Sequence, residues 1–137
     1  MKIQFFYDDV RFRLRKSTPL KDLIVEVIRG EGKVPGDLMF ILTNDKNVLK
    51  INKEFLTHDY FTDVITFDYN IEKIINGEIY ISIDTVKRNA HDYKVSFEIE
   101  LTRVVVHSVL HLCGYDDKTD DERKTMRMME DFWLDKD

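Results

Sequence analysis

The chain has 137 residues, the usual size of one domain and too few for two independent hydrophobic cores. Hydrophobic residues make up 43% of the sequence and charged residues 34%, without an acidic or basic tail, which excludes an intrinsically disordered chain. The formal net charge of −5 argues against a protein that coats nucleic acid by bulk electrostatic attraction, although a local basic groove is compatible with it. We therefore expect one globular domain over residues 1–137.

The single cysteine and the N-terminal sequence bear on the cellular compartment. Cys113 has no partner cysteine in the chain, so an intramolecular disulfide is impossible, as expected in a reducing environment. The N-terminal sequence has too short an apolar stretch for a signal peptide, and no run approaches the roughly 20 apolar residues of a membrane span. We expect a cytoplasmic protein that does not act at a membrane.

The N-terminal part of the chain predicts two strands followed by a helix. Residues 2–7 and 10–15 are rich in aromatic and branched side chains on either side of a turn-like pair of aspartates. A helix then begins after Ser17 or Thr18, either of which can cap it, and carries apolar residues at helical spacing as far as Gly30. In the second predicted strand, basic residues alternate with apolar ones, which we interpret as a solvated edge. These basic residues are Arg11, Arg13, Arg15 and Lys16.

The middle of the chain predicts one strand-helix unit and two further strands. Residues 37–43 are apolar enough for a buried strand, and Asn44 or Asp45 can cap a helix that follows it. Residues 63–69 and 78–84 then form two strands separated by a turn.

The last part of the chain predicts three helices, over residues 84–93, 96–113 and 119–134. The middle one is the most apolar of the three. Taken together, the elements predict an α+β fold in which a mixed sheet of about four strands packs against about five helices.

Two histidines and a nearby carboxylate form the most informative pattern in the sequence. His107 and His111 are four residues apart, so on a helix they lie on one face about one turn from each other and can present nitrogens to one ion. They interrupt an otherwise apolar helix, where unpaired polar groups are costly. Gly114 can take a positive φ and turn the chain back, so that Asp117, or alternatively Asp116, reaches the same ion.

This ligand set predicts a catalytic site. Three protein ligands that leave one position open for water are typical of catalytic zinc, whereas a closed set of four is structural. Cys113 is an alternative fourth ligand, but it lies on a different face of the helix, and we interpret it as a small buried hydrophobe. The sequence therefore predicts a zinc-dependent hydrolase with His107, His111 and Asp117 as the metal ligands.

The segment from His107 to Asp117 resembles the His-x3-His-x5-His signature of the YbeY family of bacterial metal-dependent endoribonucleases. The resemblance implies a metzincin-like fold, a zinc cofactor and single-strand-specific RNA cleavage in 16S rRNA 3′ end maturation and ribosome quality control. It implies as partners rRNA, the small ribosomal subunit, a ribosomal protein and an Era-like GTPase, but not DNA. Other segments resemble family motifs in the same order: INKEF with Asn52, TDVITF over residues 62–67, GEIYIS over residues 77–82, and the helix from Asp121 to Glu130.

Two positions depart from the family pattern. Asp117 stands where the family has its third histidine; a carboxylate also binds zinc, but its negative charge weakens the Lewis acidity of the metal and favours harder ions such as manganese. Leu56 stands where the family has an arginine thought to act at the scissile phosphate, and leucine cannot replace a guanidinium. Another cation would have to serve, with Arg88, Arg103 and the arginines of residues 11–15 as candidates.

Further candidate site residues follow from the missing arginine at Leu56, for His58, Arg88 and Arg103, and from the resemblance, for Asn52, Thr62 and Asp63. His58, two residues after Leu56, is a candidate catalytic residue together with His107 and His111, because an imidazolium can stabilise charge that develops on phosphate. Its alternative role is that of an exposed loop histidine. The candidate substrate-binding residues are Asn52, Thr62, Asp63, Arg88 and Arg103. The first three also have a structural interpretation, as groups that satisfy turn backbone.

Two other functions are compatible with the metal motif. Metzincin peptidases share the histidine spacing and the glycine, but they place a glutamate general base directly after the first histidine, and here that position is Ser108. Without that base, proteolysis is disfavoured. A ribosome-assembly factor that has kept the metal but lost efficient catalysis is favoured by Leu56 and disfavoured by the open ligand set.

Overall fold

The computed structural model describes residues 1–56 and 64–135, and this part of the chain forms four strands and five helices. All five predicted helices are present, with ends close to those expected. The elements follow in the order β1 (Lys2–Tyr7), α1 (Thr18–Gly30), β2 (Val34–Thr43), α2 (Asp45–Leu56), β3 (Val64–Asp68), β4 (Ile74–Ser82), α3 (Ile83–Tyr93), α4 (Phe97–Leu112) and α5 (Asp120–Leu134).

The strands form one mixed sheet in the order β1-β2-β4-β3. β1, β2 and β4 run parallel to one another, and β3 pairs antiparallel with β4. In this register Phe5 of β1 pairs with Phe40 of β2, which pairs with Ile79 of β4, so these three side chains lie on the same face. The expected α+β fold with a mixed four-stranded sheet and five helices is confirmed for the described residues.

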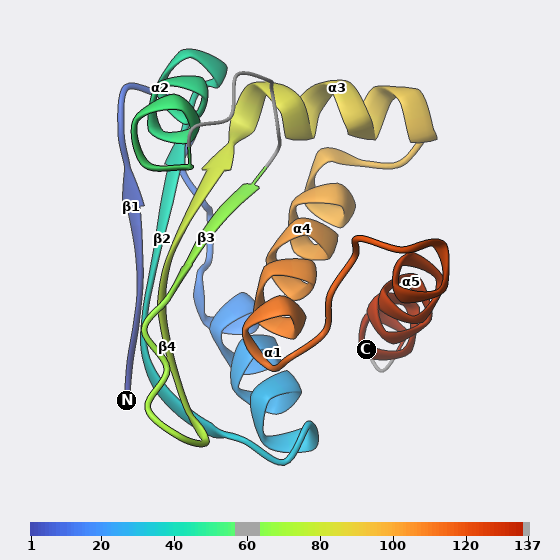
Figure 1. Ribbon diagram of the computed structural model, residues 1–137. Coiled ribbons are helices and arrows are strands. Elements are labelled where there is room, and N and C mark those ends of the chain that lie inside the picture. The colour runs from blue at the N-terminus through green and yellow to red at the C-terminus, as the bar shows by residue number, and fades with distance from the viewer. Residues whose placement is uncertain (57–63, 136–137) are drawn as a thin grey trace.

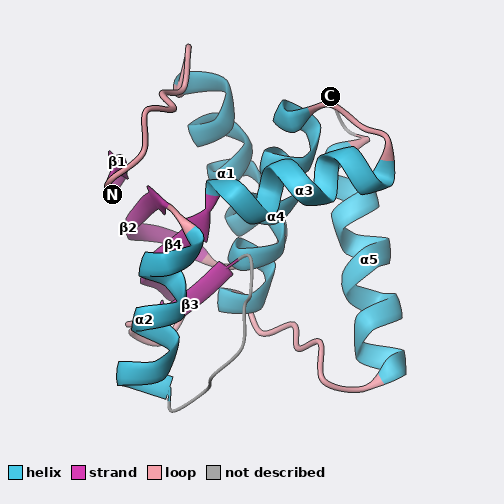
Figure 2. Ribbon diagram, turned by 90° about the horizontal axis from the view of Figure 1, so that it is seen from above, coloured by secondary structure: helices cyan, strands magenta, loops and turns pink. Residues whose placement is uncertain are grey.

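One face of the sheet is covered by helices (Figure 1). α1 and α4 pack against that face, and α5 lies against the outer side of α4. α2 and α3 follow directly on the ends of β2 and β4 and lie at that end of the sheet (Figure 2). α4 is the central helix, with nine of its 16 residues buried, mostly apolar ones whose removal from water stabilises the fold. No helix in the described part of the chain is long and apolar enough to cross a membrane.

Residues 10–15, expected to form a second strand, instead form an irregular crossing from β1 to α1. Asp9 takes a φ of 55°, in the left-handed region, and the chain leaves the sheet at this point. The Leu14 N–H donates to the Tyr7 hydroxyl at 3.0 Å and not to a neighbouring strand. The strand prediction was wrong because alternating apolar residues also suit a coil that packs them on a core, as Phe12 does here.

Candidate metal centre

The two histidines lie on the side of α4 that faces α5 and solvent. α4 begins after Ser96, whose hydroxyl accepts a hydrogen bond from the Ile99 N–H at 3.1 Å and so fixes the start of the helix. His107 is partly buried against α5, and His111, one turn further on, is exposed. The predicted placement of both imidazoles on one side of a largely buried helix is therefore present.

Glu130 of α5 orients the first histidine. Its Oε2 atom lies 2.7 Å from His107 Nδ1, and its Oε1 atom accepts a hydrogen bond from Arg103 at 2.9 Å. Burial raises the pKa of Glu130, but the hydrogen bonds from His107 and Arg103 outweigh it and hold the pKa below its usual value. An ionised carboxylate only accepts hydrogen bonds, so the proton of the imidazole is on Nδ1 and Nε2 faces the candidate site.

The loop after α4 orients the second histidine. Gly114 takes a φ of 117°, which confirms the expected turn, and the N–H groups of Gly114 and Tyr115 donate back to the carbonyls of His111 and Leu110. His111 Nδ1 in turn lies 3.0 Å from the Tyr115 carbonyl oxygen. Because a carbonyl only accepts, Nδ1 is the donor, and this leaves Nε2 as the nitrogen available to a metal, as in a metal-binding histidine held by a backbone carbonyl.

Glu31, at the end of α1, ties this loop to two helices. Its carboxylate accepts one hydrogen bond from the Tyr115 hydroxyl at 2.7 Å and another from the Trp133 indole of α5 at 3.0 Å. The hydrogen bond to Glu31, together with burial, raises the pKa of Tyr115 to about 12, so the phenol stays protonated and donates. The sequence carries no local signal for this contact, since 84 residues separate Glu31 from Tyr115.

Asp117 supplies a carboxylate beside the first histidine. Its Oδ2 atom lies 3.3 Å from His107 Nε2. Two ligands of a tetrahedral zinc ion, each about 2.0–2.1 Å from the metal, are about 3.3 Å apart, so this separation fits a shared ion. Arg123 holds the loop by donating to the Asp117 and Lys118 carbonyls at 3.3 and 2.8 Å. In residues 1–56 and 64–135 no three His, Cys, Asp or Glu side chains are gathered closely enough to hold an ion, so the third ligand stays a prediction.

A cavity of about 280 Å³ opens beside His107 and Asp117. α3, α4 and α5 each contribute side chains to its wall. The residues that line it are Asn89, Tyr93, Glu100, Arg103, Val104, His107, Asp117, Arg123, Met126, Arg127 and Glu130.

The two arginines predicted to bind substrate are engaged in ion pairs. Arg103 lines the cavity and pairs with Glu130 at 2.9 Å and with Asp131 at 2.7 Å. Arg88 of α3 pairs with Asp45 at 2.8 Å, at the start of α2.

Other predicted site residues lie apart from the histidines or cannot be placed. Asn52 is buried on α2. Cys113 is partly buried, not fully buried as expected, and packs against the core, where burial and the neighbouring Glu31 raise the pKa of its thiol to about 12. His58, Thr62 and Asp63 lie outside the described residues.

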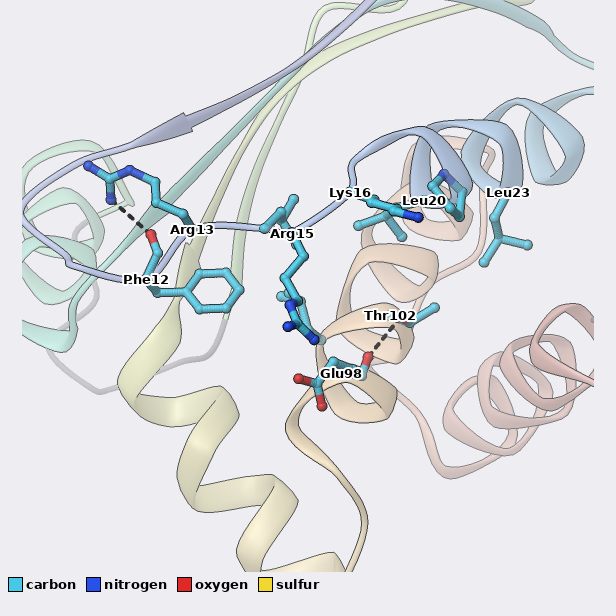
Figure 3. A pocket seen from close by; sticks show the side chains of 11 residues that line it. Phe12, Arg13, Arg15, Lys16, Leu20, Leu23, Glu98 and Thr102 are labelled. Atoms are coloured by element: carbon cyan, nitrogen blue, oxygen red, sulfur yellow. Dashed lines mark hydrogen bonds between the residues drawn. The ribbon is translucent and has the colours of Figure 1, made fainter.

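Of the basic residues at positions 11–16, Arg13, Arg15 and Lys16 line a different cavity, of about 600 Å³, between their own segment, α1 and α4 (Figure 3). Arg13 turns its guanidinium away from this cavity to the carbonyls of Val10 and Phe12, while Arg15 extends toward Glu98. Glu98 is nine residues before His107, which on an α-helix is about half a turn around the axis. This cavity, with Arg15 and Lys16, therefore lies on the opposite side of α4 from the histidines and does not face the candidate metal centre.

The fold and the site together define a class of protein. A central helix presents two histidines with oriented tautomers, and a glycine turn returns a carboxylate to one of them. This combination in a small α+β fold is typical of metal-dependent hydrolases.

Comparison with known proteins identifies the family within this class. The family described as endoribonuclease YbeY matches residues 11–136. A relative with this description from Flavobacterium psychrophilum is 46% identical over 129 residues, which cover 94% of this chain and 91% of the relative. Another from Chlorobaculum tepidum is 46% identical over 127 residues, which cover 90% of this chain and 93% of the relative. A solution structure of a Thermotoga maritima protein matches with a TM-score of 0.69 at 31% identity, covering 97% of this chain and 87% of that one. The chain belongs to the YbeY family of endoribonucleases.

Proposed function

We propose that the chain is a metal-dependent endoribonuclease that cleaves single-stranded rRNA. The observation that carries this proposal is the pair formed by His107 Nε2 and Asp117 Oδ2 at 3.3 Å, with the opposite ring nitrogen of His107 held by Glu130. Together with His111 these groups would hold one divalent ion, zinc or a harder ion such as manganese. Family membership supports RNA as the substrate.

The residues of this chain hold and orient the reacting groups. A zinc ion held by His107, His111 and Asp117 would supply positive charge toward a phosphoryl oxygen and would lower the pKa of a bound water. Glu130 and the Tyr115 carbonyl fix which nitrogen each histidine presents, and Arg123 fixes the loop that carries Asp117. We further propose that His58 stabilises charge on the phosphate, with Asn52, Thr62 and Asp63 shaping the cleft.

The biological role that we propose is 16S rRNA 3′ end maturation and ribosome quality control in the cytoplasm. Membership of the YbeY family supports an RNA substrate. The small ribosomal subunit, a ribosomal protein and an Era-like GTPase are the proposed partners, and the formal net charge of −5 favours recruitment through protein contacts over bulk attraction to RNA. Steep salt dependence of binding to isolated RNA would contradict that mode of recruitment.

Proteolysis is disfavoured by the environment of Ser108. Peptidases with this histidine spacing need a glutamate at that position to accept the proton of the attacking water. The Ser108 side chain is buried and donates its hydroxyl to the Val105 carbonyl at 2.7 Å, on the core side of α4. A role as an assembly factor without efficient catalysis is the second candidate, because Leu56 replaces the arginine of the family pattern.

One assay separates the enzyme from the assembly factor. Metal-loaded protein and its His111→Ala variant are incubated with single-stranded rRNA fragments in zinc, manganese or magnesium. Cleavage by the parent protein that is lost in the variant supports the enzyme. Absence of cleavage by the parent protein in all three metals, with metal content verified by elemental analysis, refutes it.

A further inference from the structure

The cavity beside His107 and Asp117 has three arginines on its wall, and two of them are already engaged. Arg103 is held by two carboxylates on α5. Arg123 donates to two loop carbonyls and pairs with Asp120. Neither guanidinium can turn to a ligand without giving up these contacts. Those of Arg103 are charge-assisted hydrogen bonds, and those of Arg123 hold the loop in place.

Arg127 is the third arginine and differs from the other two. It is exposed on α5, one helical turn after Arg123, and lines the same cavity as His107 and Asp117. In residues 1–56 and 64–135 no hydrogen bond or ion pair is recorded for its guanidinium. Its five N–H donors are therefore available to an anion that enters the cavity, and phosphate is the anion whose geometry a guanidinium matches.

The α3 wall of the cavity offers a second kind of contact. Tyr93 is 59% exposed although it is a large aromatic side chain, and Asn89, one turn earlier, is half-buried beside it. An exposed aromatic ring and a cationic side chain in the same cavity are the two kinds of contact by which proteins bind single-stranded nucleic acid, because every base has a face that can stack and every nucleotide carries a phosphate. At about 280 Å³ the cavity is near the lower end of the range for small-ligand sites, which suits one nucleotide and not a duplex.

We propose that Arg127 and Tyr93 form a subsite for one nucleotide of single-stranded RNA, in which Arg127 contacts a backbone phosphate and the base stacks on Tyr93. The proposal deepens the proposed function and rests on it for the identity of the ligand. It also assigns a cation for the phosphate in a chain that has Leu56 where the family pattern has arginine. Glu100 and Asp117, which also line the cavity, disfavour a second phosphate there, since like charges repel.

The test measures binding of RNA, not its cleavage, and so does not depend on the metal. Metal-free protein is titrated with a short fluorescein-labelled oligoadenylate over a series of salt concentrations, with fluorescence anisotropy as the readout. Arg127→Ala should weaken binding and lower the slope of log K against log salt by about 0.7, the value for one phosphate contact to a single strand. Lys124→Ala is the control: it removes an exposed cation from the same helix but outside the cavity, and it should leave the RNA affinity and the salt slope unchanged.

Substitutions of Tyr93 separate stacking from charge. Tyr93→Ala should weaken binding about ten-fold with no change in the salt slope, and Tyr93→Phe, which keeps the ring, should bind like the parent protein. Tyr69→Ala, at another exposed tyrosine outside the cavity, is the matched control.

Three outcomes would overturn the proposal. In the first, Arg127→Ala binds RNA with the same affinity and the same salt slope as the parent protein. In the second, Arg127→Ala and Lys124→Ala lose RNA affinity equally, and in the third, Tyr93→Phe and Tyr93→Ala do. Failure of the oligoadenylate to bind the metal-free parent protein would overturn it as well. If instead the subsite variants behave as expected and the metal-loaded protein does not cleave rRNA, the nucleotide subsite stands and the proposed nuclease activity fails.

Discussion

Replacing Glu130 by alanine should weaken both the fold and metal binding. The side chain of Glu130 is 7% exposed and makes two charge-assisted contacts, 2.7 Å to His107 and 2.9 Å to Arg103. Breaking a fully buried ion pair costs about 3–5 kcal/mol. Here the partners are 26% and 22% exposed and regain some hydration, so we expect a loss of about 2–4 kcal/mol in the free energy of unfolding. Loss of the group that orients a metal-binding histidine should lower metal affinity by about 10–100-fold.

Asp131→Ala is the matched control for this change. Asp131 also pairs with Arg103, at 2.7 Å, but it is 51% exposed, and the carboxylate that holds His107 Nδ1 is that of Glu130. Its removal should cost less than about 1 kcal/mol and leave metal affinity nearly unchanged. Unfolding in denaturant gives the stabilities, and competition with a chromogenic chelator gives the affinities. Unchanged metal affinity in Glu130→Ala, or an equal loss in Asp131→Ala, would refute the idea that Glu130 acts through the orientation of His107.

Three further changes test the loop, the third ligand and the pH dependence. Gly114→Ala should destabilise the protein by about 1–2 kcal/mol, measured by denaturant unfolding, because a φ of 117° strains any residue with a Cβ although no atom lies in its way; stability equal to the parent would contradict that. Asp117→Ala should lower metal occupancy in elemental analysis, whereas a loss seen only in Asp116→Ala would move the ligand by one residue. Burial raises the pKa of Asp45, but hydrogen bonds from Arg88 and its neighbours outweigh it, so the folded pKa lies below the ordinary value of 3.8. The stability that ionised Asp45 contributes is complete above that ordinary value and is lost as pH falls through the folded pKa. The difference in unfolding free energy between the parent protein and Asp45→Asn should therefore shrink in acid. A difference that grows in acid would refute this expectation.

The helices and most strands could be predicted because their signals are local. Apolar spacing and candidate caps depend only on near neighbours in the sequence, and the observed helices begin within a residue or two of Ser17 and Asn44. Asn44 does cap its helix by accepting from the Asn47 N–H at 2.9 Å, whereas Ser17 stands at the N-cap position of α1 without a side-chain hydrogen bond. The segment at residues 10–15 could not be predicted correctly, since alternation reports which side chains are buried and not whether a neighbouring strand is present to pair with.

The candidate site divides in the same way. The spacing of His107 and His111 and the turn at Gly114 are local, and the structure has both features. The groups that orient them are distant in sequence: Glu130 follows His107 by 23 residues. A signal for Glu130 did exist, because it lies on the buried stripe of α5 between two large apolar residues, where an unpaired carboxylate would be costly. The helical spacing within α5 predicts that this carboxylate is buried, but it does not predict which residue contacts it.

The contacts of Glu31 make the docking of the last helix and the shape of the metal loop thermodynamically linked. One carboxylate joins Tyr115 of the loop to Trp133 of α5, so a change that loosens either contact alters the environment of the other. By reciprocity, a ligand that orders the loop also favours the docked position of α5, and removal of the C-terminal turns weakens the affinity for that ligand. The carboxyl-terminal helix thus belongs to the binding equilibrium of the site, although its last turn carries none of the proposed metal ligands.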